Sequence, residues 1–72
     1  MNVYVYDRYH IREKEKTANS IDEIIARAAV DISDNHAMPI QIEDLDGNIL
    51  VDSKTLNDLA WDYIESHEGI WF

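Results

Sequence analysis

The sequence predicts an α+β fold of order β-α-β-β-α, with two helices packed on one face of a three-stranded sheet. Three patterns indicate it: an alternating apolar segment at the N-terminus, two apolar stripes of helical period, and a turn signal between two short alternating segments. With 72 residues and 46% hydrophobic content, the chain has the size and composition of one small folded domain, residues 1–72.

The first strand is expected at residues 3–6, where two valines alternate with two tyrosines. The alternation can continue to Ile11. If the helices cover the valine face, Tyr4 and Tyr6 would line an open sheet face available for self-association; ordinary cross-strand packing is the alternative. Residues 12–16 alternate in charge sign and contain nothing to bury, which predicts a solvated loop or a frayed strand end.

The first helix is predicted to begin after Ser20, which forms an S-x-x-E capping box with Glu23. Pro39 excludes its continuation beyond the polar residues 33–36. The apolar stripe that should face the core has the spacing i, i+3, i+4, i+7, i+8 and i+11, and consists of Ile21, Ile24, Ile25, Ala28, Ala29 and Ile32.

A β-hairpin is expected next, because residues 40–43 and 49–52 alternate in polarity around the strong turn signal Asp46-Gly47. The order of the strands in the sheet cannot be derived from these patterns.

The second helix should begin near Ser53 or Thr55 and stop at Gly69. The final residues 70–72 are apolar and would either pack back on the core or form a patch for dimerisation. The apolar stripe of this second helix consists of Leu56, Leu59, Ala60, Tyr63 and Ile64.

Charge is distributed very unevenly along the chain. Residues 1–16 contain four basic and three acidic residues, whereas residues 17–72 contain two basic and twelve acidic ones, and the net charge is −9. Such a field repels nucleic acids and anionic membranes and attracts basic protein surfaces. The sequence therefore predicts a basic protein partner, and no direct binding to nucleic acid or membrane.

The candidate partner-binding residues are acidic side chains around the hairpin and on the second helix, together with one tryptophan. Carboxylates at helical spacings of three and four lie close enough to repel, so local stability does not explain them. They could imitate a phosphate backbone, or simply keep the protein soluble. Trp61 could supply apolar contact or hold a partner's cation, or pack at the edge of the core. The set is Glu43, Asp44, Asp46, Asp58, Trp61, Asp62 and Glu65.

Catalytic and metal-binding motifs are not found in the sequence. There is no cysteine, the three histidines are far apart, and no nucleophile elbow or glycine-rich phosphate loop occurs. The segment starting at Asp44 does not match the calcium-binding loop, which has glycine at its sixth and glutamate at its twelfth position. Here these positions are Ile49 and Thr55. We therefore expect neither enzymatic activity nor a metal or other cofactor.

In its acidic hairpin, residues 43–46, and its acidic second helix (Asp58, Asp62, Glu65 and Glu68), the chain resembles small phage-encoded DNA-mimic inhibitors. The resemblance implies that it blocks the DNA-binding surface of a basic protein such as nucleoid-associated HU. The basic segment 8–16 departs from that type. A self-associating structural or accessory subunit, such as a homodimer, is the alternative function.

A cytoplasmic location is expected, in the host cell if the protein is phage-encoded. No apolar run approaches the roughly 20 residues of a membrane span, and the N-terminus does not resemble a signal peptide.

Overall fold

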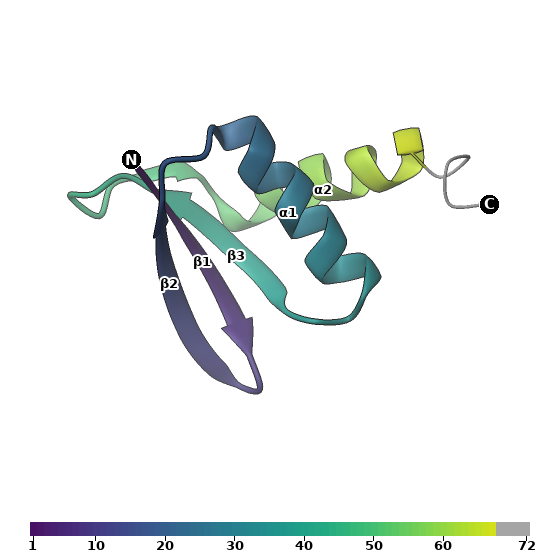
Figure 1. Ribbon diagram of the computed structural model, residues 1–72, viewed down its shortest axis with the longest axis horizontal. Helices are drawn as coiled ribbons and strands as arrows, with labels where there is room; N and C mark the ends of the chain where they lie inside the picture. The colour runs from purple at the N-terminus through teal and green to yellow at the C-terminus, as the bar shows by residue number, and fades with distance from the viewer. Residues whose placement is uncertain (68–72) are drawn as a thin grey trace.

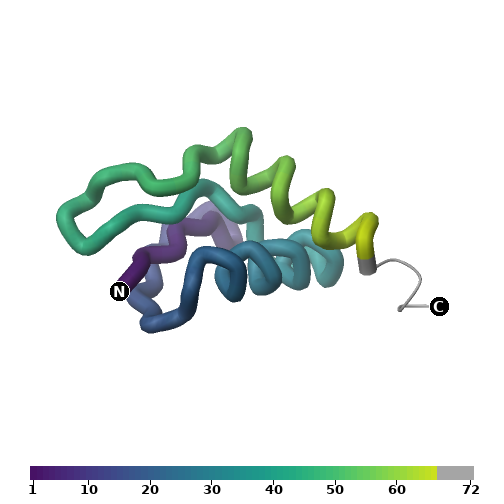
Figure 2. The backbone as a smooth tube through the Cα atoms, turned by 90° about the horizontal axis from the view of Figure 1, so that it is seen from above, coloured from purple at the N-terminus to yellow at the C-terminus, as the bar shows by residue number. Residues whose placement is uncertain are grey.

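The computed structural model describes residues 1–67, which form two helices and one antiparallel four-stranded sheet of order β2-β1-β3-β4 (Figure 1). The two helices run side by side, as the view from above shows (Figure 2). The elements are β1 (Asn2–Arg8), β2 (Ile11–Thr17), α1 (Ile21–Ser33), β3 (Met38–Glu43), β4 (Ile49–Val51) and α2 (Ser53–His67).

The predicted α+β class with two helices on one sheet face is confirmed, but the prediction of three strands is wrong. The additional strand is β2, which was expected to be a loop and which pairs with β1 along its full length. An edge strand is held by backbone hydrogen bonds to a partner on one side, and it does not require apolar side chains of its own. The alternating charges of residues 12–16 are therefore compatible with a strand, which places the two signs on opposite faces.

The turn between β1 and β2 also differs from the prediction that the first strand continues to Ile11. β1 ends at Arg8, and Tyr9 and His10 adopt positive φ values of 54° and 65°. Two consecutive residues in this region make the two-residue hairpin turn that matches the twist of antiparallel strands. Such turns usually contain asparagine and glycine, so Tyr-His gives no turn signal in the sequence.

The helices cover the tyrosine face of the sheet, so the hypothesis of an open face lined by tyrosines is wrong. Tyr4 is 1% exposed and its ring centroid lies 4.9 Å from that of Tyr6. Both belong to the core, together with residues of α1 and α2. The larger tyrosines bury more apolar area than valines, and the Tyr4 hydroxyl donates a hydrogen bond of 2.8 Å to the buried Asp31 carboxylate.

Helix α1 agrees with the prediction at both ends. The Ser20 hydroxyl accepts a hydrogen bond of 3.2 Å from the backbone N–H of Glu23. At the C-terminus, Asp34 caps the helix and Asn35 takes a left-handed φ of 53°. The predicted stripe faces the core: Ile24, Ile25, Ala28 and Ala29 are buried, and Ile21 and Ile32 are partly buried against them.

The second hairpin and α2 are likewise confirmed within the described residues. Gly47 has φ +89° in the turn between β3 and β4, and α2 begins at Ser53. Leu56 and Ala60 are fully buried, whereas Leu59 is 38% exposed. The predicted stop at Gly69 and the apolar residues 70–72 lie outside the described residues.

Candidate protein-interaction surface

Helix α2 holds the largest group of predicted partner-binding residues on its outer face. The Asp52 carboxylate accepts a hydrogen bond of 2.8 Å from the Thr55 backbone N–H and so satisfies a free donor at the helix start. Burial of Leu56 and Ala60 then fixes which side of the helix faces the core. We define the acidic row as the exposed residues on the opposite side of the helix, Asp58, Asp62 and Glu65.

No carboxylate of the acidic row forms an ion pair within 4.0 Å with a lysine or arginine, all of which lie within the described residues. Lys54 precedes Asp58 by one helical turn but does not pair with it. Its three charges occupy about 10 Å of helix axis at roughly 1.5 Å per residue. DNA carries one charge per about 1.7 Å of its axis, so the row has a lower charge density than a duplex. It can contact a few cations of a partner and cannot replace a long stretch of DNA.

Trp61 lies beside the acidic row and is 52% exposed. The helical step from Asn57 to Trp61 places both residues on the flank of α2 that borders a groove, described below. An exposed indole next to carboxylates offers a partner both an apolar contact and a face for a cation. The structure thus places Trp61 at the surface, outside the buried core cluster.

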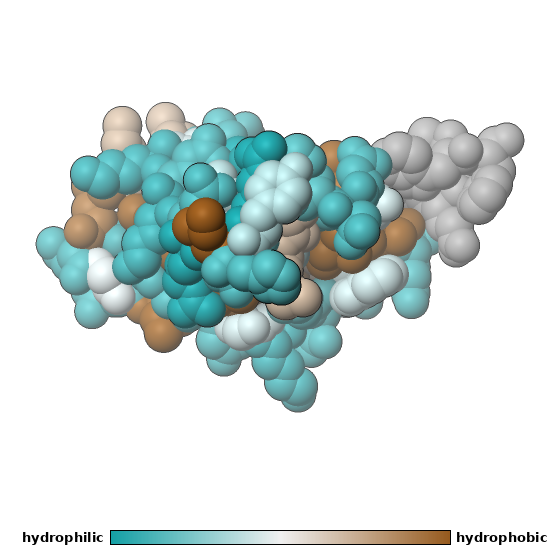
Figure 3. Space-filling model, turned by 90° about the horizontal axis from the view of Figure 1, so that it is seen from below, coloured by the Kyte–Doolittle hydropathy of each residue, from teal (hydrophilic) through white to brown (hydrophobic). Residues whose placement is uncertain are grey.

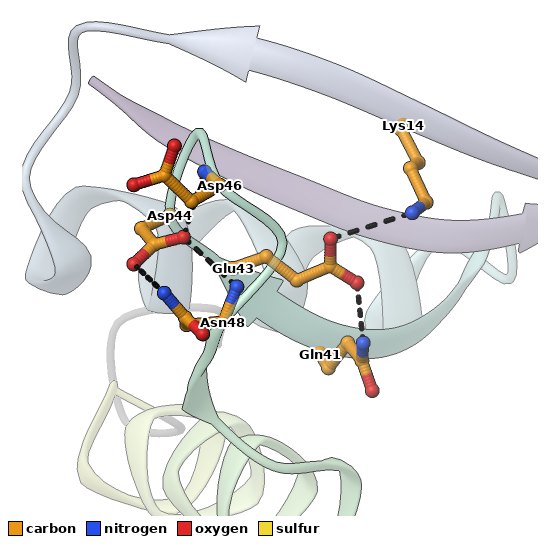
Figure 4. Close-up of polar contacts among 6 residues, drawn as sticks. All are labelled: Lys14, Gln41, Glu43, Asp44, Asp46 and Asn48. Atoms are coloured by element: carbon orange, nitrogen blue, oxygen red, sulfur yellow. Dashed lines mark hydrogen bonds and ion pairs between the residues drawn. The ribbon is translucent and has the colours of Figure 1, made fainter.

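Glu43 does not join the exposed acids, although the sequence suggested it. Its side chain lies on the open face of the sheet, is buried, and accepts hydrogen bonds from Lys14 (3.4 Å) and Gln41 (Figure 4). The carboxylate is therefore already neutralised by a cation of the same protein, and contributes little to an external negative field.

Asp44 and Asp46 lie in the β3–β4 turn, where Asp46 is exposed and Asp44 is half-buried. One Asp44 carboxylate oxygen accepts bonds of 2.9 Å from the backbone N–H groups of Asp46 and Asn48, and the other accepts one of 3.0 Å from the Asn48 amide (Figure 4). This geometry is that of an Asx turn, which closes the loop locally. Asp44 therefore has a structural role in the turn.

These bonds predict how stability depends on pH. Hydrogen bonds from Asn48 lower the pKa of Asp44 below its ordinary value of 3.8, and those from Thr55 lower the pKa of Asp52. A carboxyl group whose pKa is lower in the folded state stabilises the protein at pH values above its pKa in the unfolded state. This contribution is lost as the pH falls through its pKa in the folded state. We expect the urea concentration at the midpoint of unfolding to decrease as the pH is lowered from about 5 to about 2.

The double variant Asp44→Asn, Asp52→Asn tests that expectation, because asparagine retains an acceptor but does not titrate. Its urea midpoint should depend less on pH over this range than that of the wild type. An identical pH dependence would show that other carboxylates are responsible.

The open face of the sheet has the opposite character to the outer face of α2. Arg12, Lys14 and Lys16 project from it at alternate positions of β2, beside Asp7 and Glu43, to which Arg12 (3.2 Å) and Lys14 (3.4 Å) are paired. The charges that alternate along β2 therefore lie on opposite faces of the sheet, because Glu13 and Glu15 lie on the helix side. The basic segment is thus largely confined to the face that the acidic row does not use.

A groove that the sequence did not reveal borders Trp61. It has a volume of about 780 Å³ and lies between the β1–β2 turn, the α1–β3 connection and α2. We call it the aromatic groove; its lining includes Arg8, Tyr9, His10, His36, Met38 and Trp61. These residues are up to 53 positions apart in the sequence, so only the fold brings them together.

Within residues 1–67, no group of three or more histidine, aspartate or glutamate side chains could hold a metal ion. The same residues include no helix with the length and apolar content needed to cross a bilayer. The face in Figure 3 is mostly hydrophilic and is interrupted by small, separate hydrophobic clusters. Comparison with protein-family models, curated proteins and solved structures finds no match to this chain.

Proposed function

We propose that the protein is an acidic interaction module that occupies the DNA-binding surface of a basic nucleic-acid-binding protein. The observation that carries the proposal is the acidic row of α2, which is exposed, lies on one face of a helix and forms no ion pair with a lysine or arginine of the chain, all of which are described. Trp61 lies beside the row and adds an aromatic contact of the kind found at the centre of interfaces.

Two further features support this surface over the other acidic candidates. Glu43 is paired with Lys14 and Asp44 is used by its own turn, so neither is free to take up a partner's cation. Asp46, at the exposed tip of the turn, remains available as an outlying contact. The proposed interface is therefore the acidic row with Trp61, extended by Asp46.

Displacement of DNA from a basic protein tests the proposal. Purified nucleoid-associated HU, bound to a fluorescent duplex, would be titrated with this protein at several salt concentrations. We expect the duplex to be released and the apparent affinity to fall steeply with salt, because exposed charges separated by more than about 8–10 Å are screened at 0.1–0.15 M. The triple variant Asp58→Asn, Asp62→Asn, Glu65→Gln should compete at least about tenfold less well.

The matched control removes the same charge from other surfaces: Glu13→Gln, Asp22→Asn, Asp34→Asn. These side chains are exposed and lie outside α2. If both triple variants lose competition equally, net charge is responsible and the specific surface is wrong. If HU keeps its duplex, the same pair of variants is applied to basic proteins captured from a bacterial lysate after nuclease treatment, and equal capture of both would contradict the proposal.

The alternative, a self-associating subunit, has lost one of its two predicted surfaces. Tyr4 and Tyr6 lie in the core and cannot form an interface, while residues 70–72 lie outside the described part of the chain. Light scattering distinguishes the two functions: a stable oligomer whose mass resists salt but falls on Trp71→Ala would favour self-association.

A further inference from the structure

The aromatic groove brings aromatic and cationic side chains together in a protein whose net charge is −9. Tyr9 and Trp61, 81% and 52% exposed, provide two aromatic rings from the β1–β2 turn and from α2. The one carboxylate in the lining, Asp7, is paired with Arg12 at 3.2 Å. The volume of about 780 Å³ lies within the range of sites for small organic ligands.

Arg8 is the cation in this groove, and its surroundings are unusual. Every lysine and arginine of the chain lies within the described residues, and Arg8 is the only one of them that is half-buried. It forms no ion pair and no side-chain hydrogen bond with residues 1–67, and its Nε atom is buried without a partner. Its one close electrostatic contact is the ring of Tyr9, with Cζ 5.5 Å from the centroid. A half-buried guanidinium without an anion is costly, and an anionic ligand would relieve that cost.

The turn that carries Tyr9 is a second, independent observation. Tyr9 and His10 both have positive φ. Histidine is enriched in this region, but tyrosine rarely adopts it, and asparagine or glycine would do so with less strain. Strain of this kind persists where the surrounding structure uses the residues held in it. Here the strained turn places a tyrosine and a histidine in the groove wall.

We propose that the aromatic groove binds a planar aromatic ligand bearing an anionic group. The aromatic part would lie against Tyr9 and Trp61, and the phosphate or carboxylate would bind the Arg8 guanidinium, with His10 and His36 as further hydrogen-bond donors. A nucleotide and an aromatic carboxylic acid share this chemistry. The site shares Trp61 with the proposed interface but includes none of the acidic-row carboxylates, and it does not depend on the proposed function.

Fluorescence of Trp61 tests the proposal, in a Trp71→Phe background so that one tryptophan reports. Adenosine monophosphate and phenylacetate are the two probes, with adenosine and inorganic phosphate as controls for each half of the ligand. We expect saturable quenching by at least one probe, and binding of that probe at least about tenfold tighter than of either control. The probe that binds more tightly identifies the source of the anion.

Two variants with the same charge change locate the site. Arg8→Met should weaken binding of the probe at least about tenfold, while Arg12→Met, on the open face of the sheet, should change it less than about twofold. Amide chemical-shift changes in the wild-type protein should map to residues 8–10, 35–38 and 57–61, which needs no variant to fold. The triple variant of the acidic row should bind the probe normally. Absence of saturation by both probes, or adenosine binding as well as its monophosphate, would overturn the proposal.

Discussion

Replacement of Leu56 by alanine is expected to lower the free energy of unfolding by about 3 kcal/mol, within the range of about 2–5 kcal/mol typical of buried leucines. Leu56 is 0% exposed and belongs to the core shared by both helices and the sheet. A domain of 72 residues has roughly 4–11 kcal/mol of stability in total, so this one change removes a large part of it.

Thermal unfolding followed by circular dichroism would show the loss as a decrease in Tm of roughly 12–24 °C, at about 4–8 °C per kcal/mol for a domain of this size. The matched control is Leu59→Ala, in the same helix but 38% exposed, which should cost less than about 1 kcal/mol. Equal losses in the two variants would contradict the described orientation of α2, and with it the outward position of the acidic row.

Both helices could be predicted from the sequence because each carries a local signal that the tertiary structure does not override. The capping box at Ser20 and the stripe spacing of α1 depend on residues within one or two turns of each other. The turn at Gly47 is equally local, since its positive φ is a property of one residue. Such signals can be recognised without knowing what packs against them.

The strand β2 could not be predicted, because its stability comes from β1 and not from its own side chains. Its seven residues are exposed or half-buried, and its charges follow a period of two. The same alternation suits a solvated loop and an edge strand, and only the backbone pairing decides between them. Lysine-rich edges also resist pairing with a second copy.

The tyrosine face of β1 illustrates a different limit. Period two correctly separates the valines from the tyrosines, but both faces are buried, so hydrophobicity does not say which one the helices cover. Val3 and Val5 are 6% and 1% exposed, and the register places them between long side chains of β2 and β3, a type of side chain whose aliphatic part can cover apolar surface. The hydrogen bond from Tyr4 to Asp31, which joins residues 27 positions apart, adds to the larger apolar area of the tyrosines on the face that the helices cover.

The candidate surface was predictable only where it lies on one helix. The acidic row and Trp61 follow from helical geometry, and the structure describes them as exposed. The environment of the hairpin acids does not follow from local geometry, because the pairing of Glu43 with Lys14 depends on the position of β2. The aromatic groove combines residues from three segments and has no sequence motif at all.

Replacement of Asp31 by alanine is expected to cost about 2–3 kcal/mol, an effect second only to that of Leu56→Ala. Asp31 is 4% exposed, accepts the 2.8 Å hydrogen bond from the Tyr4 hydroxyl, and has Arg27 Nε 3.8 Å from its carboxylate. Burial, and then the bond to Asp31, raise the pKa of Tyr4 far above its ordinary value, so the hydroxyl remains a donor. The alanine variant would leave this buried donor unpaired, and would remove one of two carboxylates that hold Arg27 over the tyrosine rings.

A double-mutant cycle with Tyr4→Phe separates the hydrogen bond from the other effects of each change. Because the two side chains are in direct contact, their losses should be non-additive by about 1–2 kcal/mol in urea denaturation. Asp34→Ala, exposed and three residues further along, is the control and should change stability by less than about 0.5 kcal/mol. If the losses at Tyr4 and Asp31 add, the hydroxyl and the carboxylate are not coupled. The orientation of β1, with its tyrosines toward the helices, would then rest on apolar burial alone.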